Sequence, residues 1–205
     1  MTLKPLPRES AVEFLSSAPD WVPAEMPPGY HTRLLEIERL SADLRAMDPF
    51  GRLLWAAGPA LTEAVCDAFL ALKFEAAPMP EPAASGVTVK LNAGRLLLHV
   101  APGAGIIRKK SPELAQVFQM MQEFADDDDR VVLVANSDPA THPADRAEGI
   151  EPDAVGFLRR MGANFLASTT VFRLWMLFLQ DQVRARDYVE RLHAQDGGIF
   201  FPPPA

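Results

Sequence analysis

The side chains of this chain with the most chemical potential are His99 and two acids that precede it. His99 lies near the end of a strongly apolar stretch, Leu96–Ala101, and Glu63 and Glu75 lie upstream. A neutral imidazole is a poor ligand for Mg²⁺ and suits zinc or another transition metal better. The remaining histidines are His31, His142 and His193. No two histidines stand at the short spacings typical of a metal site, so the sequence predicts no metal and no cofactor.

Two charged runs offer other chemistry. Arg108–Lys110 comes just before an expected helix, where it would face either solvent or a phosphate-bearing ligand. Asp126–Asp129 stands between an expected helix and an expected strand, and four acids at such a junction are typical of a solvated turn. Neither run predicts a catalytic centre by itself.

The composition indicates a single cytoplasmic domain. The chain has 205 residues, of which 48% are apolar, and its net charge is −7. This size fits one domain with a sizeable core, and the acidic charge disfavours binding to nucleic acid. The single cysteine, Cys66, excludes an intramolecular disulfide and agrees with a reducing compartment. No signal peptide is evident at Met1–Pro7 and no apolar run is long enough to cross a membrane, so we expect no membrane association.

Hydrophobic periodicity predicts an α/β fold. Apolar residues recur at helical spacing between His31 and Met47, and Asp48-Pro49 is expected to break that helix. Val87–Leu91 alternates as a strand does, and the turn that follows it predicts a hairpin. In chain order, the predicted elements are helices over 31–47, 50–55 and 60–73, strands over 87–91 and 95–100, a helix from residue 111, a strand over 130–135, a helix over 152–161, a strand over 163–167 and one long helix over 168–194. This order implies a mixed central β-sheet flanked by helices.

Proline positions divide the chain into three predicted parts. Residues 1–30 are rich in proline and contain Trp21, which is typical of an arm that packs on the domain or binds a partner. Residues 31–195 are predicted to form a single α/β domain. Residues 196–205 form an apolar tail that contains three consecutive prolines.

Several local patterns follow one another in a recognisable order. The first group is Leu53-Leu54-Trp55, then Gly58-Pro59-Ala60-Leu61-Thr62-Glu63, then Leu72-Lys73-Phe74-Glu75. The second group is a strand ending in Asn136, the loop residue Arg146, and a strand that leads into Ser168-Thr169-Thr170 and an aromatic helix. Together they resemble the restriction-endonuclease-like, or PD-(D/E)xK, superfamily over about residues 50–180, in particular one bacterial branch of it. The resemblance implies a restriction-endonuclease-like core with an N-terminal helical extension.

The resemblance also implies a catalytic set that this chain lacks. Such nucleases carry an aspartate on the first hairpin strand, then an acid and a lysine two residues apart on the next strand, so that the last two share one face. The carboxylates hold Mg²⁺, and the metal and the lysine activate water. The corresponding positions here are Ser85, His99 and Ala101. We therefore expect no enzymatic activity, and a migrated acid such as Glu63 or Glu75 is the open alternative.

Apolar side chains near the two ends of the chain are the predicted binding residues. The last helix begins with a run that is apolar almost all round, so it must be buried on more than one side, in the core or in an interface. The tail cannot form a core by itself and would pack back on the domain or insert into a partner. The predicted binding residues are Trp21, Phe172, Trp175, Phe178, Ile199, Phe200 and Phe201.

Together these features favour a pseudo-nuclease, a catalytically inactive nuclease fold that acts as a protein–protein interaction, scaffold or regulatory module. The expected partner is another protein or a second copy of the chain, as in a homodimer. One alternative is a metal-dependent phosphodiesterase or nuclease with a rearranged site around Glu63, Glu75, His99 and Lys109. The other is a nucleic-acid-binding protein that does not cut.

Overall fold

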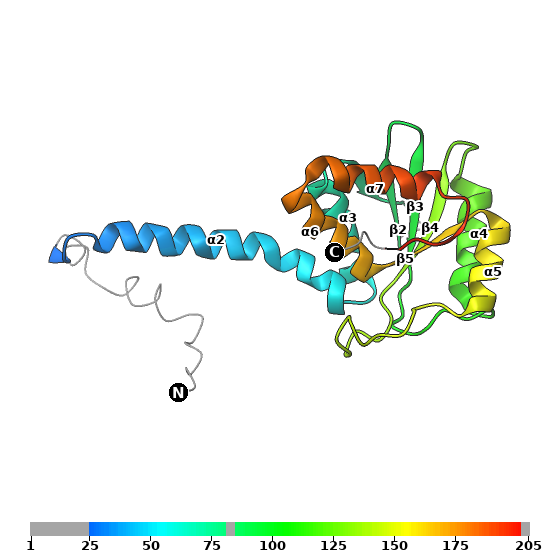
Figure 1. Cartoon of the computed structure of the whole chain (residues 1–205), viewed down its shortest axis with the longest axis horizontal. Helices are drawn as coiled ribbons and strands as arrows, with labels where there is room; N and C mark the ends of the chain where they lie inside the picture. Colours follow the sequence, from blue (N-terminus) through cyan, green and yellow to red (C-terminus); the bar gives the residue numbers. More distant parts are fainter. Residues whose placement is uncertain (1–24, 81–84, 202–205) are drawn as a thin grey trace. The chain divides into compact units, whose positions relative to one another are not determined.

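The core of the protein is a six-stranded mixed sheet, described by a computed structural model that covers residues 25–80 and 85–201 (Figure 1). The strands lie in the sheet in their chain order. Neighbours from β1 to β3 are antiparallel, and neighbours from β3 to β6 are parallel. The strands are β1 (Glu75–Pro78), β2 (Gly86–Lys90), β3 (Arg95–Val100), β4 (Arg130–Ala135), β5 (Asn164–Ala167) and β6 (Gly198–Ile199). The predicted α/β class with a mixed central sheet is confirmed.

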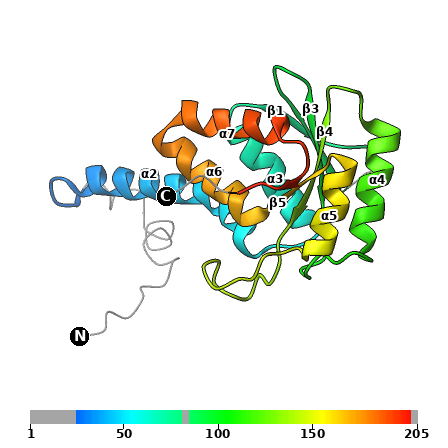
Figure 2. The same cartoon turned by 45° about the vertical axis from the view of Figure 1, so that its right-hand side comes forward.

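Helices cover both faces of this sheet. Those of the described residues are α2 (Tyr30–Trp55), α3 (Pro59–Ala71), α4 (Pro112–Phe124), α5 (Pro152–Met161), α6 (Ser168–Gln180) and α7 (Gln182–Ala194). α3, α6 and α7 lie on one face, and α4 and α5 lie on the other (Figures 1 and 2). Leu96 and Leu98 of β3 point into the first core, and Leu97 points into the second. The central parallel strands are thus buried on both faces, which explains their continuous apolar sequences.

The chain forms two compact units, residues 1–46 and residues 47–205. The described part of the first unit is residues 25–46, which includes the first turns of α2, and none of its side chains is buried. The second unit contains the sheet, the other helices and the last turns of α2, where Leu53 is buried. The sheet and its two cores therefore belong to residues 47–205.

The predicted helix break at Asp48-Pro49 is wrong, because α2 continues through Pro49 to Trp55. A proline inside a helix removes one amide donor and disfavours the helix locally. The residues after it are held by packing, since the Phe50 ring stacks on Trp175 with 4.4 Å between ring centroids and Leu53 is fully buried. Tertiary packing therefore outweighs the local cost of Pro49.

The predicted single last helix is in fact two helices, α6 and α7, joined at Asp181. Asp181 has non-helical backbone angles, φ −146° and ψ 96°, and its Oδ1 accepts a hydrogen bond from the Arg184 amide at 3.0 Å. Aspartate is a preferred residue at this position before a helix. The same residue therefore ends α6 and starts α7, so that both helices pack on the core.

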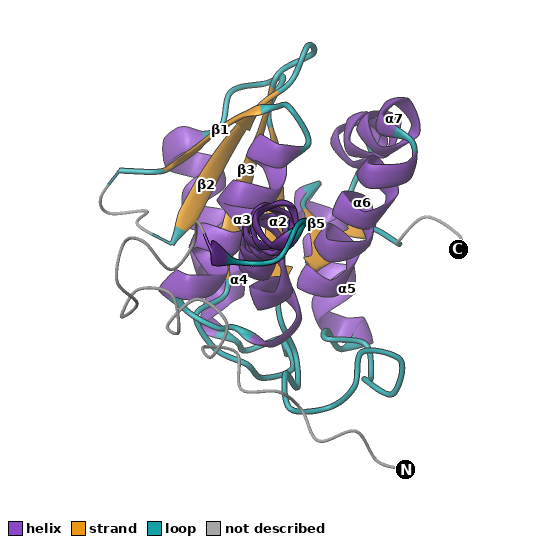
Figure 3. Ribbon diagram, turned by 90° about the vertical axis from the view of Figure 1, so that its left-hand side faces the viewer, coloured by secondary structure: helices purple, strands orange, loops and turns teal. Residues whose placement is uncertain are grey.

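Two short strands lie where the sequence predicts no strand, one between the predicted helix over 60–73 and the predicted strand over 87–91, and one in the predicted tail. β1 has the sequence Glu-Ala-Ala-Pro, which is poor in strand-forming residues, and it pairs only with β2 at the edge of the sheet (Figure 3). β6 has two residues, begins at Gly198 and pairs with β5. In both cases the neighbouring strand, and not the local sequence, determines the conformation.

Candidate functional site

The positions of the missing catalytic set lie where α4 covers β3. His99 and Ser85 line a cavity of about 110 Å³ together with Gln116 and Met120 of α4. The His99 side chain is buried, and within the described ranges its Nε2 atom has no hydrogen-bond partner. Burial lowers the pKa of His99 below its usual value, although Gln116 beside it acts in the opposite direction. Ala101 is fully buried in the core under α4 and α5.

The two acids that could have replaced the catalytic set do not share a site with His99. Glu63, on α3, forms an ion pair with Arg52 at 3.5 Å, and its side chain is 69% exposed. Glu75, at the start of β1, pairs with Lys90 at 3.2 Å. Glu63 lines a second cavity of about 470 Å³, which Ser85 also lines but neither Glu75 nor His99 does. Across the described ranges, no three His, Cys, Asp or Glu side chains are grouped so that they could hold a metal ion.

The predicted binding aromatics of α6 belong mostly to the core. Trp175 and Phe178 are buried, and Phe172 is partly buried. Trp175 contacts the rings of Phe50 and Phe172, with centroid distances of 4.4 and 5.5 Å. The aromatic side chains of this helix are thus largely covered by the chain's own residues, whereas Met176 and Leu179 remain exposed.

The predicted tail residues pack back on the sheet. Ile199 is part of β6, and the Phe200 amide donates to the Phe165 carbonyl at 2.9 Å. Phe200 is buried, whereas Phe201 remains 65% exposed. Trp21 lies outside the described residues.

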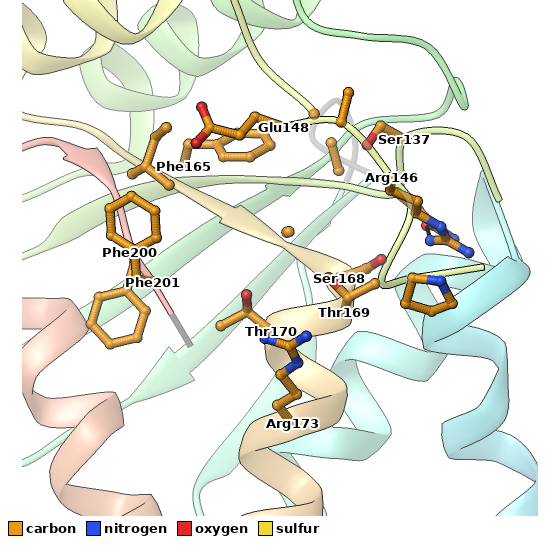
Figure 4. A pocket seen from close by; sticks show the side chains of 17 residues that line it. Ser137, Arg146, Glu148, Phe165, Ser168, Thr169, Thr170, Arg173, Phe200 and Phe201 are labelled. Carbon is orange, nitrogen blue, oxygen red and sulfur yellow. Dashed lines mark hydrogen bonds between the residues drawn. The ribbon is translucent and has the colours of Figure 1, made fainter. Parts of the chain in front are cut away.

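A cavity of about 190 Å³ lies where β4 and β5 end (Figure 4). These two strands are parallel neighbours, with Ala135 opposite Ala167, so the segments that follow them leave the sheet at the same edge. In open α/β sheets, ligands bind at this edge, outside the carboxyl ends of the strands. The loop after β4, the first turn of α6 and the chain after β6 line the cavity.

Arg146 and Asn136 hold the cavity wall in place. The Asn136 amide donates from Nδ2 to the Ala56 carbonyl at 2.8 Å and accepts at Oδ1 from Arg146 Nη1 at 2.8 Å. Arg146 also donates to the carbonyls of Leu54 at 2.6 Å and Thr141 at 2.8 Å. Leu54 lies at the end of α2, where free carbonyls attract a cation. The pair therefore fastens the loop after β4 to the end of α2.

The first turn of α6 presents polar groups to the same cavity. Ser168, Thr169 and Thr170 line it, and Arg173 lies one turn further on (Figure 4). The Ser168 side chain is buried, and its Oγ has no hydrogen-bond partner among the residues that the structure describes. No side chain caps this helix, and its first turn contains no acid. The opening amides of a helix have no carbonyl of their own helix to bind, so they remain available to an acceptor.

The charge around the cavity is unevenly distributed. Arg173 is exposed, and the described part of the chain offers it no ion-pair partner. Arg146 bonds only to neutral oxygens within the same ranges. Glu148 is the one acid among the lining residues, and it lies beside Phe165, away from Arg173 (Figure 4). The α6 side of the cavity is therefore positive, and the Phe165 side is apolar with a single carboxylate.

The sequence pattern includes some residues of this site but does not predict that they lie together. Asn136, Arg146 and the Ser168–Thr170 run belong to the pattern that resembles the nuclease family, and the structure brings all of them to one cavity. Arg173, Glu148 and the role of Ser168 as an unpaired donor were not predicted. One sequence feature could have predicted the site. Two expected parallel strands are each followed by polar residues, and the ends of parallel strands lie at one edge of the sheet.

Comparisons of the chain with models of known protein families, with curated proteins and with solved structures gave no match. None of the helices within the described residues is both long enough and apolar enough to cross a membrane.

Proposed function

We propose that this chain is a binding protein on a nuclease-like framework without nuclease activity, and that it acts through protein–protein contact with a second copy of itself. The antiparallel β2–β3 hairpin and the β3–α4–β4 crossover support the nuclease-like framework. The burial of His99 and Ala101 under α4 supports the loss of activity, because Ala101 is enclosed in the core and only a cavity of about 110 Å³ adjoins His99. The ion pairs of Glu63 and Glu75 with basic residues support it further.

The observation that carries the proposal is an exposed apolar stripe on the first part of α2. Ile37, Leu40 and Leu44 are 43%, 48% and 65% exposed. Their spacings of three and four residues place them on one side of a helix, as in the seam of a coiled coil. An isolated helix is marginally stable in water, and its stability in proteins comes mainly from packing of its apolar face.

A second copy of the same helix fits this stripe. It would bring an identical seam with matching spacing, so that each apolar side chain meets others of its kind. Charged residues occupy the flanks, among them Arg39 and Asp43, which pair within the helix at 3.1 Å. These flanks stay in solvent when two stripes meet.

The test is the mass of the full chain in solution, measured by sedimentation over a range of concentrations. We expect a dimer for the natural sequence and a monomer for Leu40→Glu, because a charge in the seam would be desolvated. Ala42→Glu is the matched control, since it adds the same charge on the opposite side of the helix, where Ala42 is exposed. A natural chain that stays monomeric at every concentration would overturn self-association.

A cleavage assay with Mg²⁺ or Mn²⁺ tests the enzymatic alternative. We expect no cleavage of DNA or RNA. Metal-dependent cleavage that is lost in Glu63→Ala would replace the proposal with a rearranged phosphodiesterase, since Glu63 lines the largest of the cavities described above.

A further inference from the structure

We infer that the cavity at the ends of β4 and β5 binds the phosphate group of a small phosphomonoester. This site goes beyond the proposed self-association, because it lies within residues 135–201 and uses none of the apolar stripe on α2. Three independent features of the cavity carry the inference.

The first feature is the uncapped start of α6. This helix has 13 residues and no side-chain cap, so its opening amides lack a partner from their own helix. The helix dipole adds partial positive charge at the same point, and the two effects together favour an anion there. Neither effect alone would define a site.

The second feature is the Ser168 hydroxyl. Ser168 is 1% exposed and lines the cavity, yet its Oγ has no hydrogen-bond partner. A buried hydroxyl without a partner costs about 1–3 kcal/mol, so such groups are rare unless a ligand satisfies them. An anion oxygen bound to the α6 amides would supply that partner.

The third feature is the charge of Arg173, which no acid of the described residues balances. Arg173 lines the cavity one turn into α6, and no acid of the described residues pairs with it. A guanidinium matches the oxygens of a phosphate or carboxylate through two parallel hydrogen bonds. Arg146 adds a second positive charge in the wall, because all of its bonds go to neutral oxygens.

The number of donors favours phosphate over carboxylate. The opening amides of α6, the hydroxyls of Ser168, Thr169 and Thr170, and the Arg173 guanidinium approach from several directions. A carboxylate has two oxygens in one plane, whereas a phosphomonoester has three terminal oxygens in a tetrahedron. The tetrahedral phosphate can therefore accept hydrogen bonds from the donors at the start of α6 and from the guanidinium at the same time.

The volume of the cavity and the residues of the wall opposite α6 indicate the size and chemistry of the rest of the ligand. The cavity volume of about 190 Å³ is below the roughly 300 Å³ at which pockets for larger ligands begin. Phe165 and Phe200 line the wall opposite α6, and Glu148 lies beside Phe165 (Figure 4). The ligand is therefore small, with an apolar body against the two rings. Glu148 would accept a hydrogen bond from a hydroxyl or amine on that body.

The test is calorimetric titration of the full chain with inorganic phosphate, phenyl phosphate and benzoate at low ionic strength. We expect saturable binding of both phosphates at one site per chain, with phenyl phosphate tighter because its ring adds apolar contact. Benzoate is expected to bind at least about tenfold more weakly than phenyl phosphate. Equal affinity for benzoate would overturn the choice of phosphate, and absence of saturable binding would overturn the site.

Two variants locate the binding on α6. Arg173→Gln is expected to weaken phosphate binding about tenfold, the usual effect of losing one charge-assisted bond. Arg184→Gln is the matched control, because it removes the same charge from an exposed position of α7 outside the cavity and should leave the affinity unchanged. Equal affinities of the natural chain and Arg173→Gln would contradict the assignment.

A third variant, Thr169→Asp, separates loss of binding from loss of folding. An acid in the first turn of α6 stabilises the helix through its dipole, so this variant should fold and melt no lower than the natural chain. The same carboxylate occupies the place of the anion, so phosphate binding should be lost. Unchanged binding in a folded Thr169→Asp protein would overturn the proposal. Because the oligomer is measured separately, failure of this site and failure of self-association remain distinguishable.

Discussion

The two edges of the parallel strands differ in how their charges are used. At the edge where β3 and β4 begin, here called the amino edge, Arg95 pairs with Asp126 at 2.8 Å and with Asp129. Arg130, at the same edge, donates to the Gly162 carbonyl at 3.0 Å and lies 3.5 Å from Asp196. At the opposite carboxyl edge, where β4 and β5 end, the two arginines that line the cavity, Arg146 and Arg173, have no acidic partner within the described residues.

This difference distinguishes charged side chains that stabilise the fold from charged side chains that remain available to a ligand. Arg95 and Arg130 at the amino edge each join segments that are distant in sequence, and an acid of the segment held lies beside each of them. Arg173 at the carboxyl edge holds no other segment of the described chain. A buried polar group without a partner, such as the Ser168 hydroxyl, beside a charge without a partner is a physical indication of a ligand.

Arg146 gives the largest expected effect, because of the two arginines that line the cavity it is the one that also holds other segments of the described chain. We expect Arg146→Ala to lower the free energy of unfolding by about 3 kcal/mol, since Asn136 and the carbonyls of Leu54 and Thr141 would lose their donor. Urea denaturation measures this change. Arg108→Ala serves as the control, because Arg108 only pairs with Glu151 at the surface and should cost under about 1 kcal/mol.

Asp129 is the matching test at the amino edge. Its carboxylate accepts hydrogen bonds from the Arg95 amide at 3.0 Å and the Asp126 amide at 2.9 Å, as well as from the Arg95 guanidinium. We expect Asp129→Ala to cost about 2 kcal/mol in the same denaturation experiment. Asp127→Ala, an exposed neighbour in the same acidic run, should change stability by less than about 0.5 kcal/mol. Equal effects of the two variants would show that the whole run is a solvated turn.

The Asp129 contribution has a defined dependence on pH. Burial by itself raises the pKa of this carboxyl, but the hydrogen bonds from Arg95 and Asp126 outweigh burial and leave its pKa below the usual value. The ionised form is thus favoured in the folded state. Its stabilisation is fully present above the unfolded pKa of about 3.9 and is lost as the pH falls through the lower folded pKa. The difference between the natural chain and Asp129→Ala should therefore shrink below about pH 3.9.

The sequence predicted the sheet because the relevant signals are local. β3 and β4 are continuous apolar runs, as strands buried on both faces must be. Gly162 ends α5 with left-handed backbone angles, φ 70° and ψ 18°, which favour glycine. Other features depend on contacts with distant segments. These are the continuation of α2 through Pro49, the junction of α6 and α7, and the strands β1 and β6. Such contacts leave little trace in a window of neighbouring residues.

The candidate site was less predictable for a related reason. Asn136 and Ser168 are separated by a helix and a strand, and only the pairing of Ala135 with Ala167 brings their segments to one edge. Arg173 is a candidate ligand-binding residue because it has no ion-pair partner among the described residues. Whether a charge has a partner depends on the folded structure, so the sequence does not show it. The family resemblance points to Ser85, His99 and Ala101, and His99 Nε2 does lack a partner among the described residues. The cavity that combines an unpaired hydroxyl with an unpaired arginine lies instead where β4 and β5 end.

The two ends of β5 provide the smallest and most specific test of the comparison. Asn164 begins the strand at the amino edge, and its Nδ2 donates to the carbonyls of Leu192 at 3.0 Å and Gln195 at 3.1 Å. Ser168 follows the strand at the carboxyl edge and has an unpaired Oγ. Asn164→Ala should lower the free energy of unfolding, whereas Ser168→Ala should leave it unchanged or raise it by about 1 kcal/mol, because an unsatisfied buried group is removed.

The second readout for Ser168→Ala is the affinity for inorganic phosphate, which should fall even though the protein is no less stable. A residue that only packs in the core loses stability on truncation and leaves binding unaffected. A residue that serves a ligand shows the reverse, because its unpaired hydroxyl costs free energy until the ligand arrives. Reduced stability with unchanged phosphate affinity in Ser168→Ala would mean that the two edges of the sheet do not differ in the way inferred from their charges.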